Sequence, residues 1–226
     1  MSVQENKNLV FTIKDKCRVC FTCVRECPVK AIRIVNGQAE VMQERCIACG
    51  NCTRVCSQGA KAFLNSVSNV QKLLKSDQKI AALVAPSFAS EFAEFNDYRE
   101  VVGRIRELGF DKVYEVAFGA DMVAREYRKL MYSDKKRGYI SSDCPAIVNY
   151  IEKYHTPLIE DLAPLVSPMV AMSRYIKNKV DRNFKIVFIG PCIAKKAESE
   201  EIDEILTFVE LREMFNELDA TSMPSD

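Results

Sequence analysis

The alternation of apolar and polar residues predicts short strands and one hairpin in the first third of the chain. Residues 9–13 alternate and predict a strand. Residues 32–42 place apolar side chains on both sides of Asn36-Gly37, the pair that two-residue hairpin turns prefer because both positions take positive φ. Residues 66–76 carry apolar residues with helical spacing, so we expect a helix that links this part of the chain to the next.

From residue 77 the pattern changes to apolar runs that alternate with helical segments. The runs predict strands at residues 80–85, 113–118, 139–142 and 185–190. Helices are expected at residues 98–108 and 120–131, twice between Cys144 and Asn178, and at residues 208–218. This alternation predicts a parallel sheet covered on both faces, with functional groups where strands end and helices begin. We expect a domain boundary near Asp77, which gives domains of residues 1–76 and 77–226.

Eight of the ten cysteines form two copies of one spacing, 29 residues apart. Three thiolates at i, i+3 and i+6 on one tight loop can bind three irons of a 4Fe-4S cubane, while the fourth cysteine of the same copy lies too far along to reach that cluster. Each fourth cysteine is therefore assigned to the other cluster. The spacing predicts one cluster on Cys17, Cys20, Cys23 and Cys56, and a second on Cys46, Cys49, Cys52 and Cys27.

Two structural zinc sites and a disulfide framework are the alternatives for these cysteines. Zinc usually takes its thiolates as two pairs separated by a longer loop, and disulfide frameworks are typical of small secreted chains. Over residues 9–66 the chain resembles the bacterial-type two-cluster ferredoxins, with Pro28 after Cys27 and with Ser57 where that family repeats the proline. The resemblance implies an α+β ferredoxin-like two-cluster module, which is followed here by an α/β lobe.

Composition and charge restrict the remaining functions. The formal net charge of +1 provides no overall field that would attract nucleic acid or an anionic membrane. Residues 1–16 lack the apolar stretch of a secretory signal, and no run reaches the roughly 20 apolar residues of a membrane span. We expect a soluble, cytoplasmic protein whose cysteines persist as thiolates. Basic residues crowd the cysteine module, either to offset anionic clusters or as a solvated face: Arg18, Arg25, Lys30, Arg33, Arg45, Arg54 and Lys61.

The two remaining cysteines, Cys144 and Cys192, each lie beside a proline and after a predicted strand. As isolated residues they would be small buried hydrophobes. Together with the two-cluster module, however, Cys144-Pro145 and residues 191–196 make the whole chain resemble the iron-only (FeFe) hydrogenases. That family binds an H-cluster, in which a cysteine bridges a 4Fe-4S cubane to a di-iron unit with CO and cyanide ligands.

The resemblance assigns roles to four residues of the second half of the chain. It implies that Cys144 and Cys192 are ligands of the cubane, and that Lys195 and Ser87 contact the two cyanides. Iron-bound cyanide carries negative charge, so an ammonium and a hydroxyl donor are suited to hold it.

The chain departs from the hydrogen-evolving members at the positions that relay protons. Asp143 stands where those members have a relay cysteine, and it is our candidate relay residue. Leu130 and Ala163 fall where a glutamate and a serine continue the relay, and Gly190 stands in place of a methionine. This combination resembles the sensory branch of the family. The third motif, Cys-x-x-x-Cys, has no counterpart after Cys192, so we expect the chain to be the amino-terminal portion of a longer sensory-type member.

The favoured function is hydrogen or redox sensing, with electron transfer through the two clusters and little or no hydrogen turnover by this chain alone. An H-cluster would be present only where the missing carboxy-terminal motif is supplied. The expected partner is a redox protein or a downstream signalling domain. Two other functions stay open: an electron-transfer ferredoxin module with a docking lobe, and an iron-sulfur assembly factor. Ser87 and Lys195 favour the hydrogenase-like function, because an assembly factor has no cyanide to hold.

Overall fold

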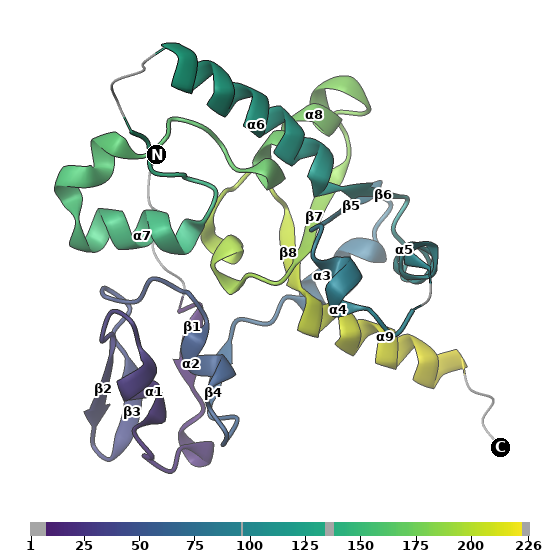
Figure 1. The fold of residues 1–226 in the computed structure, drawn as a ribbon. Helices are drawn as coiled ribbons and strands as arrows, with labels where there is room; N and C mark the ends of the chain where they lie inside the picture. The colour runs from purple at the N-terminus through teal and green to yellow at the C-terminus, as the bar shows by residue number, and fades with distance from the viewer. Residues whose placement is uncertain (1–7, 96, 134–137, 223–226) are drawn as a thin grey trace. The chain divides into compact units, whose positions relative to one another are not determined.

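The computed structural model describes residues 8–95, 97–133 and 138–222 (Figure 1). The chain forms two compact units, and each is built from segments that are distant in the sequence. Unit 1 comprises residues 1–64, 140–162 and 192–198, and unit 2 comprises residues 65–139, 163–191 and 199–226. The segments around Cys144 and Cys192 therefore lie in the same unit as the eight clustered cysteines. The domain boundary near residue 77 stays a prediction.

Two antiparallel strand pairs form the frame of unit 1. β1 (Val10–Thr12) pairs with β4 (Lys61–Phe63), and β2 (Ile32–Val35) pairs with β3 (Gln38–Val41). The strand expected at residues 9–13 and the hairpin expected at 32–42 are confirmed, with Asn36 at φ 48° and Gly37 at φ 70° in the turn. Such short pairs are marginal by themselves, so unit 1 depends on side-chain packing and on what its cysteines hold.

The helices of unit 1 are short, apart from α7. α7 (Pro145–Tyr154) begins at a proline, whose fixed φ suits the first helical position, and it is followed by η2 (Thr156–Asp161). Four other helical segments lie beside the cysteines: η1 (Lys14–Lys16), α1 (Thr22–Glu26), α2 (Asn51–Arg54) and η3 (Ile193–Ala197).

The strand expected at residues 139–142 is wrong. A single isolated bridge joins Ile140 to Leu162 in its place. Ser141 Oγ donates to Asp143 Oδ2 at 3.0 Å and accepts from Asp143 N at 3.4 Å. These local side-chain bonds offer the backbone an alternative to a strand ladder, and they bend the chain just before Cys144.

Unit 2 is built on a four-stranded parallel sheet in the order β6-β5-β7-β8. Its strands are β5 (Ile80–Val84), β6 (Lys112–Glu115), β7 (Lys185–Gly190) and β8 (Glu204–Thr207). β5 and β7 lie in the centre, and every residue of β5 is buried. A continuous apolar run is what a strand covered on both faces requires, so the predicted parallel sheet is confirmed.

Helices cover both faces of this sheet (Figure 1). α6 (Val116–Ser133) and α8 (Pro168–Lys179) pack together on one face. The short helix α4 (Phe88–Glu91) comes after β5 in the sequence. The other face carries α3 (Val67–Leu74), α5 (Tyr98–Glu107) and α9 (Phe208–Ser222), and Arg104 of α5 pairs with Asp219 of α9 at 2.6 Å. The linking helix expected at residues 66–76 is confirmed as α3. None of the helices within the described ranges has the length and the apolar sequence that crossing a bilayer requires.

The apolar run at residues 113–118 is a strand only in its first part. The strand stops at Glu115 and α6 begins at Val116, with no loop between them. A Cβ on Gly119 would lie 2.3 Å from the Pro168 carbonyl oxygen, so the backbones of α6 and α8 are in direct contact there. This close packing, which the local pattern does not encode, favours helix at the end of the run.

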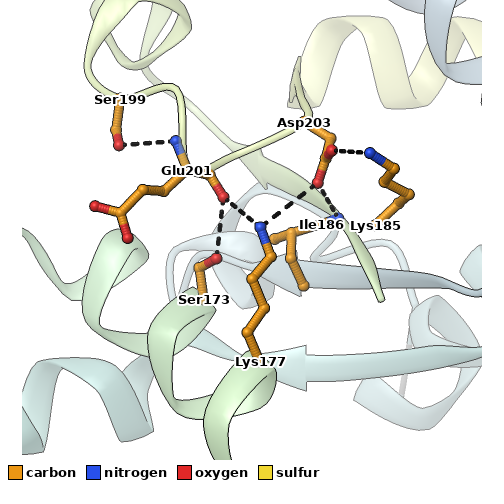
Figure 2. A network of polar contacts seen from close by, with 7 residues as sticks. All are labelled: Ser173, Lys177, Lys185, Ile186, Ser199, Glu201 and Asp203. Carbon is orange, nitrogen blue, oxygen red and sulfur yellow. Dashed lines mark hydrogen bonds and ion pairs between the residues drawn. The ribbon is translucent and has the colours of Figure 1, made fainter. Parts of the chain in front are cut away.

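β8 is a strand that the sequence pattern did not predict, because an acidic stretch precedes it. Figure 2 shows how that stretch is held. Asp203 accepts the backbone N–H of Ile186 at 2.8 Å and pairs with Lys185 at 2.8 Å. Lys177 of α8 donates to the Glu201 carbonyl at 2.9 Å. Cations from α8 and β7 thus offset the acidic residues and direct the chain into the edge position beside β7.

A buried carboxylate fixes the start of α9. Glu210 is 1% exposed, and its Oε2 accepts the backbone N–H of Thr207 at 2.6 Å and the Thr207 hydroxyl at 2.7 Å. Glu210 N donates in return to Thr207 Oγ1 at 3.3 Å, which makes a capping box. Glu210 Oε1 accepts from Ser66 N at 2.6 Å, just before α3. One carboxylate therefore satisfies donors at the amino ends of two helices.

Replacing Glu210 with alanine should lower the free energy of unfolding by about 3 kcal/mol or more, because three buried donors lose their acceptor. Urea denaturation followed by circular dichroism measures the change. Glu213→Ala is the matched control: Glu213 is exposed on the next turn of α9 and accepts from Asn65 Nδ2 at 3.1 Å. That control should change the free energy by about 0.5 kcal/mol or less. Equal effects in the two variants would contradict the role given to Glu210.

Candidate functional site

The two cysteine loops share one backbone conformation. Val19 and Phe21 in the first loop have φ values of 53° and 62°, and their repeat equivalents Ala48 and Gly50 have 57° and 75°. Residues other than glycine rarely adopt this left-handed conformation, so the surrounding structure must stabilise it. It places a tight turn between successive cysteines, which a loop needs if it is to present three thiolates to one cluster.

Backbone N–H groups point at the sulfur atom of each fourth cysteine. Ala31 N lies 3.2 Å from Cys27 Sγ, and Ala60 N lies 3.3 Å from Cys56 Sγ at the equivalent position of the repeat. Although burial opposes the change, hydrogen bonds from the backbone N–H groups of the residues that follow lower the pKa of Cys56. Such donors stabilise the thiolate, which is the form that binds iron.

Mutual interactions separate the eight thiols into two groups of four. Burial raises the pKa of Cys23, and three neighbouring thiols raise it further: Cys56, Cys17 and Cys20. Burial also raises the pKa of Cys52 to about 12, and there the contributing thiols are Cys46, Cys49 and Cys27. Each group joins three cysteines of one loop to the fourth cysteine of the other copy. These are the crossed sets expected from the spacing, and their assignment as ligands stays a proposal.

The residues present fit two 4Fe-4S clusters. Each group supplies four thiols, which is the ligand set of such a cluster, together with backbone donors to sulfur. In the part of the chain that the structure describes, no three His, Cys, Asp or Glu side chains surround a position for a single metal ion. A four-iron cluster does not require that convergence, because each thiolate binds a different iron.

α7 packs on the segment that leads into the second cysteine loop. Lys153 Nζ donates to the Cys46 carbonyl at 2.6 Å and to the Gln43 carbonyl at 3.2 Å. Tyr154 OH donates to the Arg45 carbonyl at 2.8 Å. Sequence reasoning missed both residues, because their acceptors are backbone carbonyls, which every residue carries.

The segment that carries Cys192 lies against the second loop as well. A Cβ on Gly50 would be 2.7 Å from Ile193 Cδ1, so Ile193 occupies the space that the glycine leaves free. A small apolar cluster contains Ile193 together with Cys192, Cys52 and Ala146 of α7. The two segments that carry single cysteines therefore meet at the second loop. Cys192 is half-buried there, whereas Cys144, which directly precedes α7, is exposed.

Lys195 contacts Asp143, another of the predicted site residues, and an acidic residue that was not predicted. Its ammonium donates to the Asp143 carbonyl at 2.9 Å and forms an ion pair with Glu198. The Lys195 and Glu198 side chains are each 13% exposed. Asp143 Oδ1 is buried without a hydrogen-bond partner among the described residues. Glu198, which the sequence pattern did not single out, therefore competes for the ammonium that the resemblance assigns to a cyanide.

The other expected site residues lie in unit 2. Ser87 is exposed and follows β5 at the carboxyl edge of the sheet. Gly190 ends β7, and a Cβ there would lie 2.6 Å from Phe188 Cζ, so Phe188 fills the space that a methionine at this position would need. Ala163 is 4% exposed and Leu130 is half-buried on α6. Neither of these two side chains can carry a proton.

Two family models match the chain over most of its length. The model described as "Iron only hydrogenase large subunit, C-terminal domain" matches residues 78–225. The model described as "4Fe-4S dicluster domain" matches residues 9–57, which contain the eight clustered cysteines. The first model alone accounts for more than half of the 226 residues.

Curated relatives match at low identity. Iron hydrogenase 1 of Clostridium pasteurianum is 28% identical over 185 residues, which cover 70% of this chain and 32% of the relative. A probable cytosolic Fe-S cluster assembly factor of Anopheles gambiae is 25% identical over 56% of this chain and 32% of the relative. A protein of the same description from Drosophila ananassae is 27% identical over 54% of this chain and 31% of the relative. The chain thus spans about a third of the length of these relatives.

Solved hydrogenase structures share the fold. The apo FeFe-hydrogenase HydA1 from Chlamydomonas reinhardtii, in a cysteine-to-histidine variant, superposes with a TM-score of 0.61 at 21% identity, over 72% of this chain and 50% of that one. The structure of HydA(deltaEFG), reported for stepwise H-cluster assembly, gives 0.59 at 24% identity, over 72% of this chain and 49% of that one. With a two-cluster region followed by this α/β lobe, and with both family models matched, the chain belongs to the iron-only hydrogenase family.

Proposed function

We propose that the chain is the electron-relay portion of a redox-sensing relative of the hydrogenases. When bound, its two 4Fe-4S clusters supply single-electron transfer between a partner protein and the site marked by Cys144 and Cys192. The partner is a redox protein or a downstream signalling domain. The residues of the chain hold the cluster loops and the single-cysteine segments in one unit.

The contact between Gly50 and Ile193 is the observation that carries this proposal. Ile193 follows Cys192 directly, and Gly50 lies inside the second cysteine loop, so the two sites are separated by little more than one side chain. Electron transfer becomes slow as the distance between centres grows. An intervening distance this short supports transfer between the second cluster and whatever Cys192 binds. Lys153 strengthens the connection, because it ties α7 to the Cys46 carbonyl at 2.6 Å.

The residues present do not fit a complete H-cluster. Cys144 and Cys192 supply two thiolates, whereas its cubane takes four ligands. The proton path supports sensing over turnover as well, since Asp143 replaces the relay cysteine of the hydrogen-evolving members and Ala163 cannot carry a proton. A site of this kind can register a redox state without fast chemistry.

The relay can be tested with a photoactive ruthenium–bipyridine label on Cys192, in a Cys144→Ser background so that one free thiol remains. After anaerobic reconstitution with iron and sulfide, a laser flash injects an electron, and transient absorption records cluster reduction. Because Cys192 lies against the second loop, we expect Cys27→Ala, which removes a proposed ligand of the second cluster, to slow the transfer at least about tenfold.

Cys56→Ala is the matched control, because it removes the equivalent ligand of the first cluster. It should leave the injection rate within about twofold of the parent. Equal rates in the two variants would contradict a relay that runs through the second cluster to Cys192.

Iron-sulfur cluster assembly is a second candidate function. Lys195 is already paired with Glu198 and with the Asp143 carbonyl, which leaves it less able to hold a cyanide. The two insect relatives are described as assembly factors. Infrared spectra of a longer chain that includes a Cys-x-x-x-Cys segment, recorded after maturation, distinguish the two functions. Bands of CO and cyanide support the hydrogenase-like site, whereas their absence together with cluster transfer to an apo-ferredoxin supports assembly.

A further inference from the structure

Lys61 occupies a core position of unit 1. The two copies of the cysteine pattern are 29 residues apart, so Lys61 is the repeat equivalent of Ile32. Both side chains are buried, and each residue is 5% exposed. The second copy therefore places an ammonium where the first copy places an aliphatic side chain. Lysine is almost never fully buried without a partner, so this position requires an explanation.

The hydrogen bonds of Lys61 do not neutralise its charge. Its Nζ donates to Thr12 Oγ1 at 2.5 Å and to the Ala39 carbonyl at 2.9 Å. Thr12 lies directly opposite Lys61 in the β1–β4 pair, and Ala39 belongs to β3. A hydroxyl and a carbonyl carry no net charge. In residues 8–95, 97–133 and 138–222, no carboxylate oxygen lies within ion-pair distance of this ammonium.

The residues around the Lys61 ammonium pack against both groups of cysteines. Its Nζ binds the Ala39 carbonyl at 2.9 Å, and Ala39 lies in one buried cluster with Cys23 of the first group and with Cys27 and Cys52 of the second. Cys23 is 8% exposed and Cys52 is half-buried, so water does little to screen a charge there. The ammonium is thus held beside a residue that packs against cysteines of both proposed clusters.

We propose that Lys61 is a buried counter-ion shared by both clusters, and that its fixed positive charge raises the reduction potential of each. This inference rests on the two-cluster function proposed above. A 4Fe-4S core with four thiolates is anionic, and reduction adds one electron and one further negative charge without making or breaking a bond. A nearby cation in a poorly screened interior stabilises the reduced form more than the oxidised form. The interaction also repays the cost of burying the ammonium.

The test is a redox titration of Lys61→Met after anaerobic reconstitution, with dithionite as the electron donor and electron paramagnetic resonance as the readout. We expect the reduction equilibrium of both clusters to become less favourable by at least about tenfold, which is ~59 mV for one electron. Lys61→Ile, which installs the residue of the first repeat, should give the same shift. A merely structural role for Lys61 would not move the two potentials in one direction.

Arg33→Met is the matched control, because Arg33 is an exposed cation of the same module and follows Ile32, the repeat equivalent of Lys61. Its removal should change each reduction equilibrium by less than about twofold, since water and salt screen an exposed charge. A shift as large as that of Lys61→Met would show that burial is irrelevant and would overturn the proposal.

Iron analysis separates a failure of this inference from a failure of the two-cluster function. A wild-type chain with about four irons, or with zinc, would refute the two clusters themselves. If the wild type holds about eight irons, three results would overturn the role of Lys61 and leave the two-cluster function intact. These are unchanged potentials in a fully loaded Lys61→Met or Lys61→Ile protein, a shift of one cluster only, and failure of both variants to hold eight irons.

Discussion

Replacing Cys27 with alanine should reduce the iron content of the reconstituted protein from about eight to about four irons per chain. Cys27 is 8% exposed and accepts from Ala31 N at 3.2 Å, in the arrangement that Cys56 shares with Ala60 N. Its thiol interacts with the cysteines of the second loop although it follows the first loop in the sequence. Alanine offers no ligand atom, so the second cluster loses one of its four thiolates.

Double variants distinguish crossed ligand sets from sets within one copy. With crossed sets, Cys27→Ala combined with Cys49→Ala removes two ligands of the same cluster, so about four irons should remain. Cys27→Ala combined with Cys20→Ala removes one ligand from each cluster and should leave almost none. Iron and sulfide analysis, together with the resonance spectrum of the reduced protein, provides the measurement. The opposite result, in which the Cys20 combination retains about four irons, would require each copy to hold its own cluster.

Hydrogen evolution from reduced viologen should be absent in residues 1–226, even after anaerobic maturation with the di-iron precursor. On the proposed assignment the chain supplies two of the four thiolates of the cubane, at Cys144 and Cys192. The same assignment leaves the proton path incomplete, because Asp143 stands where the resemblance places the relay cysteine and Ala163 cannot transfer a proton. Proton transfer by a positioned group typically contributes roughly 10²–10⁴-fold to a rate. We therefore expect slow evolution only in a longer chain that carries the Cys-x-x-x-Cys segment.

In that longer chain, Asp143→Cys should raise the rate, because it restores the first step of the relay. Asp143 Oδ2 accepts from Ser141 Oγ at 3.0 Å, so its carboxylate is held by its own turn. Ser141→Ala, which releases the carboxylate without supplying a thiol, is the control and should leave the rate within about twofold of the parent. Rapid evolution by residues 1–226 would contradict both the ligand count and the sensing function.

Expectations that depended on short stretches of backbone were accurate. Asn36-Gly37 determines its turn because both residues accept positive φ. The central strands β5 and β7 could be predicted from their apolar runs, since a strand buried on both faces has no polar side to present. The cysteine spacing likewise limits which thiols one loop can offer to one cluster, because the reach of the backbone is fixed.

Expectations that depended on neighbours from distant segments were inaccurate. The pattern at residues 139–142 is that of a strand, but the structure gives this stretch only one isolated bridge, from Ile140 to Leu162, in place of a strand partner. β8 follows an acidic stretch, and it forms because Lys185 and Lys177 lie where they can offset Asp203 and bind the Glu201 carbonyl. The ends of β6 and α6 were misplaced for the same reason, since contact with α8 determines them.

The sequence by itself determined which family the cysteine pattern resembles, how the thiols are spaced and where the central strands lie, because each depends on neighbouring residues and the geometry of one chain segment. Only the tertiary structure decided the environment of the charged side chains. The sequence left open whether Lys61, like Arg33, offsets an anionic cluster or belongs to a solvated face, and the structure shows it 5% exposed between β1, β3 and β4. Lys195 is held by Glu198 and the Asp143 carbonyl. A side chain does not encode its own burial, which depends on the segments that fold around it.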